Sequence, residues 1–338
     1  MSRSEAQPDH PQVVHGRVGV LLINLGTPDA PEAGAVRRYL AEFLSDPRVI
    51  EIPQWLWRPF LHGVVLRLRP RKSAEAYRQV WTVEGSPLAA ITRRQAHALQ
   101  EQLGDQVLVE HAMRYGNPGI AGAIDRLAGA GCDRILAAPL YPQYCAATTA
   151  SAQDSLFAVL ASLRRQPALR TLPAYYDDPL YIDALKASVD RQLGALDFDP
   201  QRLLLSFHGM PQRTLELGDP YHCHCQKTAR LLGEQLAIPS DIAFQSRFGR
   251  AKWLEPATDA ILAAYPGKGI TRVAIAAPGF SADCVETLEE LAIRGRDSFL
   301  AAGGERIATL DCLNDSPEGM HMLEGLVRRE LAGWLQRE

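Results

Sequence analysis

Residues 203–211 read Leu-Leu-Leu-Ser-Phe-His-Gly-Met-Pro, a short apolar run that ends in a Gly-x-Pro turn. Residues 20–28 read Val-Leu-Leu-Ile-Asn-Leu-Gly-Thr-Pro and end in the same way. Short continuous apolar runs bounded by turn residues are typical of strands that are buried on both faces of a parallel sheet. Each segment therefore predicts the first strand of an α/β unit.

Eight β-rich runs alternate with helix-like polar and apolar stretches along the chain. This alternation predicts an α/β fold of two similar Rossmann-like lobes, each with a parallel sheet flanked by helices. Ligands of such sheets bind at the carboxyl ends of the strands, which places the active-site cleft between the lobes. The expected strands are 18–25, 106–113, 134–138 and 169–174 in the first half, and 202–207, 242–246, 272–277 and 306–311 in the second.

Two further matches between the halves support a duplicated unit. Arg114-Tyr115-Gly116 and Arg247-Phe248-Gly249 each follow a second strand. After the third strand, a Pro is followed by a Cys six residues later and a Thr three residues further on. Chance matching among common turn residues is the alternative, but three matches in one order favour duplication. The third set comprises Pro139, Cys145 and Thr148 in the first half, and Pro278, Cys284 and Thr287 in the second.

The expected organisation has four parts. Residues 1–16 form a flexible polar leader, 17–168 the first lobe, 169–312 the second lobe, and 313–338 a C-terminal helix that packs back on the first lobe. Net charge is only −3, which gives no support for nucleic-acid binding. The leader has no apolar signal-peptide core, and no apolar run reaches the ~18 residues of a membrane span. A cytoplasmic protein, monomeric or weakly dimeric, is expected.

An insertion distinguishes the first half from the second. Leu25 and Arg114 are 89 residues apart, whereas His208 and Arg247 are 39 apart. The segment at about 45–95 holds three of the five tryptophans, including Trp57, and a basic run follows its apolar stretch. We call this segment the lip. So many large apolar residues favour an exposed cover for a flat apolar ligand, although a helical hairpin that buries its own aromatics is the alternative.

His208 and a group of acidic residues are the candidate reactive groups. His208 directly follows a buried strand, and neutral imidazole can bind a divalent metal or accept a proton near neutral pH. A hydrogen-bonded turn histidine is the alternative. Glu286 and Glu290 are four residues apart and could share a helix face with Asp283 nearby, which would form a carboxylate column for Fe²⁺ or protons. Alternatively, Asp283 and Glu286 form an acidic capping box.

The run His222-Cys223-His224-Cys225 has ligand-type side chains but lacks the spacing of a zinc site. Structural zinc sites use two spaced ligand pairs, and nothing nearby completes the set. The six cysteines are expected to remain thiols in a reducing compartment. There is also no P-loop, no full G-x-G-x-x-G and no G-x-S-x-G. Nucleotide binding and the simplest hydrolase chemistry therefore have no support.

Taken in order, several segments resemble the ferrochelatase family from about residue 19 to residue 315. Each is short, but the set in this order is highly specific. They include the turns after both first strands, Gly85-Ser86-Pro87-Leu88, Pro139-Leu140-Tyr141-Pro142-Gln143-Tyr144, Gly218-Asp219-Pro220-Tyr221, Gln245-Ser246-Arg247, Trp253-Leu254, and residues 281–290.

The resemblance, to the bacterial type of ferrochelatase, implies a lyase that inserts ferrous iron into protoporphyrin IX at the last step of haem biosynthesis. His208 and Glu286 would be the catalytic pair and the metal ligands, with Asp283 and Glu290 as secondary carboxylates. The lip would cover porphyrin or touch the inner face of the membrane. The expected substrate-binding residues are Arg114, Tyr115, Leu25, Trp57, Phe60 and Trp253.

Departures from the family's pattern limit what is carried over. Cys284 stands where animal members have a histidine, and no cysteine follows Cys312. We therefore expect no iron–sulfur cluster and no cofactor, with Fe²⁺ as a substrate. The alternatives are a related chelatase for another metal or tetrapyrrole, and a haem or metal carrier without enzymatic activity. The residues do not decide between protoporphyrin and coproporphyrin, nor which of His208 and Glu286 takes protons and which passes metal.

Overall fold

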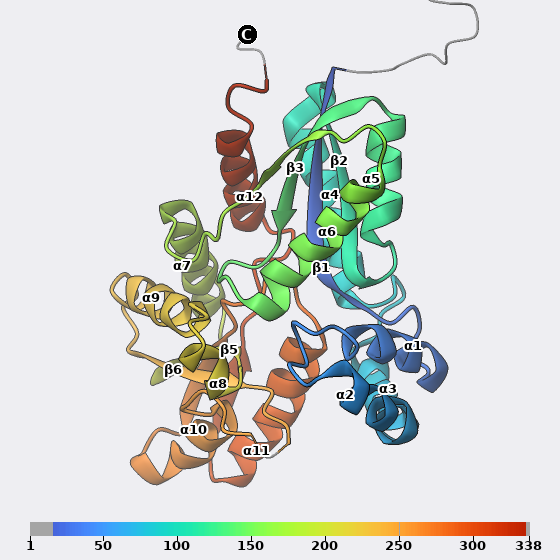
Figure 1. Cartoon of the computed structure of the whole chain (residues 1–338). Helices are drawn as coiled ribbons and strands as arrows, with labels where there is room; N and C mark the ends of the chain where they lie inside the picture. Colours follow the sequence, from blue (N-terminus) through green and yellow to red (C-terminus); the bar gives the residue numbers. More distant parts are fainter. Residues whose placement is uncertain (1–15, 250, 336–338) are drawn as a thin grey trace, which may run out of the picture.

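The computed structural model describes residues 16–249 and 251–335 and contains two four-stranded parallel sheets (Figure 1). The expected leader falls almost wholly outside these residues. The first sheet has the order β2-β1-β3-β4 and the second β6-β5-β7-β8, so both have the same topology. Their strands are β1 (Arg17–Thr27), β2 (Val107–Gly116), β3 (Cys132–Pro139) and β4 (Ala168–Thr171), then β5 (Arg202–His208), β6 (Ser240–Gln245), β7 (Arg272–Ala276) and β8 (Arg306–Thr309).

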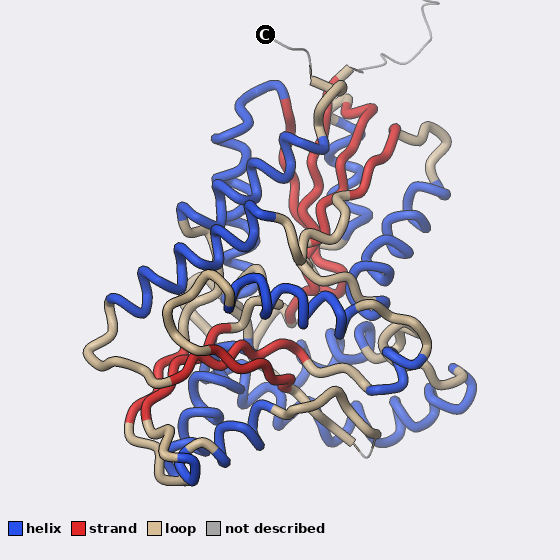
Figure 2. The backbone as a smooth tube through the Cα atoms, turned by 90° about the vertical axis from the view of Figure 1, so that its left-hand side faces the viewer, coloured by secondary structure: helices blue, strands red, loops and turns tan. Residues whose placement is uncertain are grey.

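All eight expected strands are present, and the two-lobed α/β fold class is confirmed. The strands of the two sheets run in clearly different directions (Figure 2). The expected boundary between residues 168 and 169 is misplaced, because it cuts through β4. Residues 168–171 pair with residues 134–137 of β3 and so belong to the first sheet.

Side chains alternate between two cores on either side of the first sheet. Val20 and Leu22 of β1 face one core, while Leu21 and Ile23 face the other, as the period of two in a strand requires. α5 (Ile120–Gly129) and α6 (Ser151–Ser162) cover the second of these faces.

The first core is continuous with the second lobe. It joins residues of β1 and β3 to residues of β5, so the two lobes share one apolar interior. Four helices contribute to it: α4 (Pro87–Leu103), α7 (Pro179–Gly194), α9 (Tyr221–Gly233) and α12 (Pro317–Glu330). The C-terminal α12, coloured red in Figure 1, packs against α7, α4 and β3.

The other face of the second sheet has its own core. Leu204, Val273 and Ile275 are completely buried there. The helical elements that cover them are α10 (Thr258–Ala264), the π-helix η5 (Glu286–Gly295) and α11 (Arg296–Ala301). The short α8 (Gln212–Glu216) lies between β5 and α9 in the chain.

The additional residues of the first half form a helical unit beside the sheet. α1 (Ala33–Phe43) is followed by α2 (Gln54–Phe60), the π-helix η1 (Leu61–Val65) and α3 (Leu66–Val80). α3 packs against α1 and also against η5 of the second lobe. The last part of the lip, residues 87–95, is the first half of α4, and the later residues Ala96, Leu99 and Leu103 of this helix belong to the shared core. The lip therefore combines a helical hairpin with the start of a core helix.

The repeat is real, although one of its three matches is out of register. Both lobes place a π-helix after the third strand: η3 (Ala146–Ala150) and η5. Arg114–Gly116 lies inside β2, but Arg247–Gly249 follows the end of β6. The sheet register pairs Gly26 with Tyr115 and His208 with Gln245, so Arg247 is not the structural counterpart of Arg114.

The two Gly-x-Pro turns need glycine for the same steric reason. A Cβ on Gly26 would lie 1.8 Å from the carbonyl oxygen of Tyr115, and one on Gly209 would lie 2.4 Å from that of Gln245. Any side chain would push the neighbouring strand away. The glycines therefore allow the chain to turn closely over the end of each sheet, where the candidate site lies.

Candidate functional site

His208 is the last residue of β5 and is held there by three backbone contacts. Its Nδ1 lies 2.7 Å from the carbonyl oxygen of Gly209, and the Gly209 N–H donates to the carbonyl of Gln245 at 2.7 Å. The hydroxyl of Tyr221 donates to the His208 carbonyl at 3.0 Å. A carbonyl oxygen only accepts, so Nδ1 carries the hydrogen in the neutral ring. Nε2 then keeps its lone pair for a proton or a metal ion.

Glu286 begins the π-helix η5 at the junction of the two lobes. Its carbonyl accepts a hydrogen bond from Nε2 of Gln245 at 2.8 Å, and the Cys284 thiol lies near its carboxylate. Tyr39 of α1 and Tyr77 of α3 lie near this carboxylate. Burial raises the pKa of the Cys284 thiol, and the neighbouring Glu286 raises it further. The thiol therefore stays protonated beside Glu286.

Burial and the Glu286 charge also act on the two tyrosines. Burial raises the pKa of Tyr77 and of Tyr39, and the proximity of Glu286 adds to both shifts. Both phenols therefore stay protonated and uncharged. Two phenols and one thiol near the Glu286 carboxylate are therefore uncharged.

The other two members of the expected carboxylate column already have protein partners. Oδ1 of Asp283 accepts from the Thr287 hydroxyl at 2.7 Å, and Oδ2 accepts from Nδ2 of Asn314 at 2.6 Å. Both oxygens of Glu290 accept from Ser246, at 2.7 Å from its N–H and 2.5 Å from its hydroxyl. Asp283 accepts from the side chain of Thr287 and not from the backbone of Glu286, so Asp283 and Glu286 do not form the capping box that was the alternative.

Arg114 and Tyr115 lie in a buried network instead of on an open surface. Tyr115 is completely buried, and its hydroxyl donates to Oδ2 of Asp46 at 2.8 Å. Nη2 of Arg114 donates to the same oxygen at 2.6 Å, and the Ser151 hydroxyl does so at 2.5 Å. The expected contact of Tyr115 with substrate is therefore not possible in this arrangement. The network fixes the loop after α1, where the lip begins.

Leu25 and Trp253 lie on opposite sides of the lobe junction. Leu25 is half-buried and packs in the clusters that contain Tyr39 and Cys284. Only 8% of Trp253 is exposed, and its indole N–H donates to the carbonyl of Phe248 at 3.0 Å. Trp253 also forms a β-bridge with Pro211 and lies beside Gly209. Trp253 therefore supports the turn that carries His208.

The two expected aromatic contacts of the lip differ in exposure. Phe60 is 51% exposed, with its ring 5.6 Å from that of Trp57. Trp57 is half-buried, and its indole N–H donates to the carbonyl of Leu44 at 2.6 Å. Phe60 is thus available to a ligand, whereas Trp57 also anchors the hairpin. Further exposed apolar side chains of this helical unit are Trp55, Leu56, Val64 and Leu68.

The His222–Cys225 run is helical, and its side chains diverge. It forms the first turn of α9, where successive residues point about 100° apart. Cys223 is exposed and Cys225 is buried, while the His224 ring stacks on Tyr176 with centroids 3.6 Å apart. No three His, Cys, Asp or Glu side chains in residues 16–249 and 251–335 are grouped so as to hold a metal ion.

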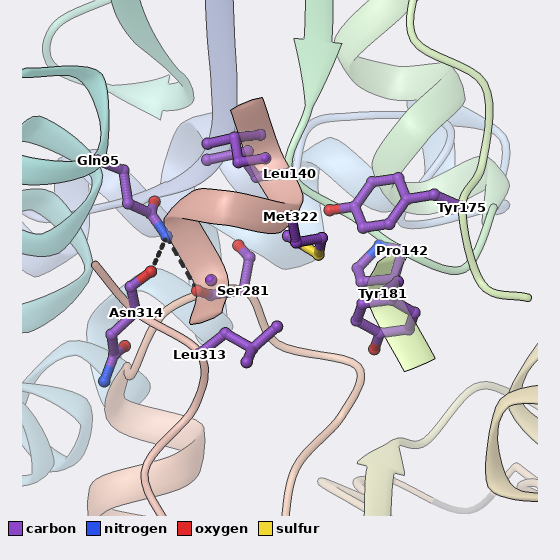
Figure 3. A pocket seen from close by; sticks show the side chains of 11 residues that line it. Gln95, Leu140, Pro142, Tyr175, Tyr181, Ser281, Leu313, Asn314 and Met322 are labelled. Carbon is purple, nitrogen blue, oxygen red and sulfur yellow. Dashed lines mark hydrogen bonds between the residues drawn. The ribbon is translucent and has the colours of Figure 1, made fainter. Parts of the chain in front are cut away.

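A small cavity lies where both lobes meet α12 (Figure 3). Gln95 of α4 donates there to the carbonyls of Ser281 and Asn314, at 3.1 and 2.9 Å. The volume is about 10 Å³, which suits one water molecule and no organic ligand. This contact ties α4 to the segments on either side of η5, so the cavity serves the lobe junction.

Several residues around the site were not identified from the sequence. Asp46, Tyr39 and Tyr77 lie on the helical unit of the first lobe, far from the strand ends along the chain. Gln245 is the last residue of β6, a position at which polar side chains reach a ligand site in α/β sheets. That position, together with the segment Gln245-Ser246-Arg247 that resembles the family, was the available signal for Gln245.

The chain has a two-lobed α/β fold that is also seen in solved structures of other proteins. It superposes on SirB from Bacillus subtilis, solved with Fe³⁺, with a TM-score of 0.57, 13% identity, and coverage of 94% of this chain and 96% of that one. CbiX, described as the terminal enzyme for biosynthesis of siroheme in denitrifying bacteria, gives a TM-score of 0.52 at 16% identity, covering 93% of this chain and all of that one. These likenesses concern the fold.

Sequence comparison identifies the family. The profile of the ferrochelatase family matches residues 17–331. The ferrochelatase of Rhizobium meliloti is 53% identical over 338 residues, covering 98% of this chain and 100% of that protein. The ferrochelatase of Methylibium petroleiphilum is 53% identical over 334 residues, covering 97% of this chain and 92% of that protein. The chain belongs to the ferrochelatase family.

Proposed function

We propose that this chain inserts ferrous iron into protoporphyrin IX to form protohaem, the terminal step of haem biosynthesis. Family membership over almost the whole chain supports this reaction. The observation that carries the site is the link through Gln245, which pairs with His208 in the sheet and donates to the carbonyl of Glu286. Gln245 thereby links the backbone that carries the imidazole to the backbone that carries the carboxylate.

The reaction sets two chemical tasks. Two pyrrole N–H protons leave the ring as Fe²⁺ enters. The uncharged ring core and Fe²⁺ therefore give an uncharged iron–porphyrin core and two protons. We assign proton acceptance to Nε2 of His208, because Nδ1 is already used by the Gly209 carbonyl. We assign passage of Fe²⁺ to Glu286, because carboxylate oxygen suits this ion. Bending of the ring would expose its nitrogens to both groups.

The substrate is expected to be a relatively apolar porphyrin. Phe60 offers an exposed aromatic face, and arginines follow in the same helical unit, where they could meet the carboxylates at the edge of the ring. A more carboxylated tetrapyrrole would call for more basic groups. Competition between protoporphyrin and coproporphyrin for Fe²⁺ insertion by the purified protein tests this preference directly.

No helix among the described residues is both long and apolar enough to cross a bilayer. We propose peripheral contact of the lip with the inner face of the membrane, supported by Trp55 and Leu68, which are 75% and 72% exposed. Arg58 and Arg67 are exposed nearby and could meet anionic headgroups. Co-sedimentation with anionic vesicles should fall when Trp55 and Leu68 are both changed to Ser, and unchanged sedimentation would exclude this contact.

We propose that the protein works without an iron–sulfur cluster or other cofactor. Burial raises the pKa of the Cys225 thiol, which opposes the thiolate form that a cluster needs. Cys223 is exposed and Cys225 is buried, so the two thiols lie on different sides of α9.

The experiment that tests the proposed function is anaerobic incubation of the purified chain with Fe²⁺ and protoporphyrin. Formation of protohaem with repeated turnover, followed by absorbance, is the expected result. Binding of one porphyrin or one iron per chain without turnover would support the carrier alternative instead.

A further inference from the structure

Only 3% of Gln245 is exposed, and both the oxygen and the nitrogen of its side-chain amide form hydrogen bonds. Oε1 accepts from the Ser206 hydroxyl at 2.8 Å, and Nε2 donates to the carbonyl of Glu286 at 2.8 Å. The Ser206 hydroxyl also lies 2.8 Å from that of Thr258. The amide thus spans from the interior of β5 to the first residue of η5, in one fixed orientation.

The next residue makes a second contact with the same helix. Ser246 donates through its N–H and hydroxyl to the two oxygens of Glu290, one helical turn after Glu286. Ser246 adopts a φ of 65°, which non-glycine residues rarely adopt. The end of β6 therefore binds the first turn of η5 through two successive residues. The unusual backbone conformation of Ser246 directs both of its donors toward the helix.

These contacts connect the two proposed catalytic groups through one residue. Gln245 faces His208 across the β5–β6 ladder, and Gly209 donates to its carbonyl oxygen. The main chain of Gln245 thus holds the turn after His208, while its side chain holds the backbone of Glu286. A small rotation of the amide would move Glu286 relative to His208.

We propose that Gln245 is a positioning residue for iron insertion, which sets the placement of Glu286 relative to His208. This inference rests on the proposed function, because Glu286 must act in the reaction for its placement to matter. Gln245 makes no contact with substrate in this account. Misplacement of a reacting group by about 1 Å can lower a rate on the order of 100-fold.

The first variant is Gln245→Met, which keeps length and volume but loses both hydrogen bonds. We expect kcat to fall on the order of 10–100-fold, with the KM for porphyrin nearly unchanged. The matched control is Thr258→Val, which removes a hydroxyl from the same buried network without touching Glu286. It should keep kcat within about twofold of wild type, because the Gln245–Glu286 hydrogen bond remains.

The second variant, Gln245→Glu, separates positioning from general stability. When protonated, the introduced carboxyl group can accept from Ser206 and donate to the Glu286 carbonyl, which restores both hydrogen bonds. When ionised, it loses the donor and places a charge beside Glu286. The titratable groups facing this position are His208 from β5 and Glu286 with Glu290 from η5. The two carboxylates and burial favour the protonated form.

The activity of Gln245→Glu relative to wild type should therefore rise as pH falls, while that of Gln245→Met relative to wild type stays low at every pH. Equal losses of kcat in Gln245→Met and Thr258→Val, or a Gln245→Glu protein that is as slow as Gln245→Met at every pH, would overturn the proposal. An inactive wild-type protein would instead contradict the proposed function.

Discussion

Nη2 of Arg114 lies 2.6 Å from Oδ2 of Asp46, and only 17% and 4% of these side chains are exposed. Arg114 of β2 is largely buried, and Asp46 at the start of the lip compensates its charge. The pair joins the lip to the first sheet, together with Tyr115 and Ser151. The pair is therefore expected to affect folding stability.

Asp46→Asn should lower the free energy of unfolding at pH 7 by about 3 kcal/mol, because it leaves Arg114 without its buried counter-charge. Urea denaturation measures this change. Asp154→Asn is the matched control, because Asp154 pairs with Arg48 on the surface at 2.8 Å with both side chains about half exposed. That variant should change stability by less than about 1 kcal/mol. Equal losses in both variants would refute the buried-pair assignment.

The same carboxylate also predicts a pH dependence. Burial by itself would raise the pKa of Asp46, but hydrogen bonds from Ser151, Arg48 and Tyr115 and the Arg114 charge outweigh it and lower the pKa. The folded pKa thus lies below the unfolded value of about 3.9. Stabilisation is complete above pH 4 and is lost as pH falls through the folded pKa. The stability gap between wild type and Asp46→Asn should be constant from pH 5 to 8 and shrink below pH 4; a gap that widened there would contradict it.

The acidic residues near η5 should separate into a functional and a structural group. Glu286→Gln should lower kcat on the order of 100-fold and change the free energy of unfolding by less than about 0.5 kcal/mol. Asp283→Ala should instead destabilise the protein by about 2–3 kcal/mol, because it leaves the donors of Thr287 and Asn314 unpaired. Steady-state kinetics and urea denaturation on both variants check this. A fully active Glu286→Gln protein would remove Glu286 from the mechanism.

Two aromatic residues of the lip should respond differently to substitution. Phe60→Ser should weaken porphyrin binding, since burial of an exposed aromatic against a ligand contributes about 1–3 kcal/mol, and should hardly affect stability. Trp57→Ser should cost about 3 kcal/mol of stability, because it removes a packed side chain and its bond to the Leu44 carbonyl. Fluorescence titration and thermal unfolding separate these effects. Unchanged porphyrin affinity in Phe60→Ser would show that the exposed ring does not meet substrate.

Purified protein should show no visible absorption from an iron–sulfur cluster and no stoichiometric bound iron. Cys223 and Cys225 lie on different sides of α9, one exposed and one buried, and cannot act as a pair. Iron analysis and absorbance of protein purified without oxygen measure this. Two irons per chain that disappear in Cys223→Ser would contradict the prediction.

The strands and the repeat could be predicted from the sequence because they depend on local patterns. Short apolar runs followed by turn residues identify β1 and β5, and sterics at Gly26 and Gly209 explain why those turns need glycine. The predicted equivalence of Arg114 and Arg247 was wrong, because similar sequence does not fix the register between neighbouring strands. The boundary near residue 168 was misplaced for a related reason: β4 is defined by its pairing with β3.

The functional residues were predictable in part. The position of His208 at the end of a strand could be predicted, because the apolar run that precedes it is visible in the sequence. The burial of Tyr115 could not, since it depends on Asp46, which is 69 residues away in the chain. Likewise, Glu290 looks like a column member by its spacing from Glu286, yet Ser246 of a different element takes up both of its oxygens. Long-range pairing decided each of these outcomes.

Anaerobic Fe²⁺ insertion by His208→Ala, measured together with porphyrin binding by fluorescence, tests the proposed role of His208 most directly. His208 holds its Nδ1 against the Gly209 carbonyl and leaves Nε2 as the proposed base, while the expected apolar contacts with the ring lie elsewhere. We expect loss of protohaem formation to background, with porphyrin affinity close to that of wild type. Near-normal turnover in His208→Ala would contradict it.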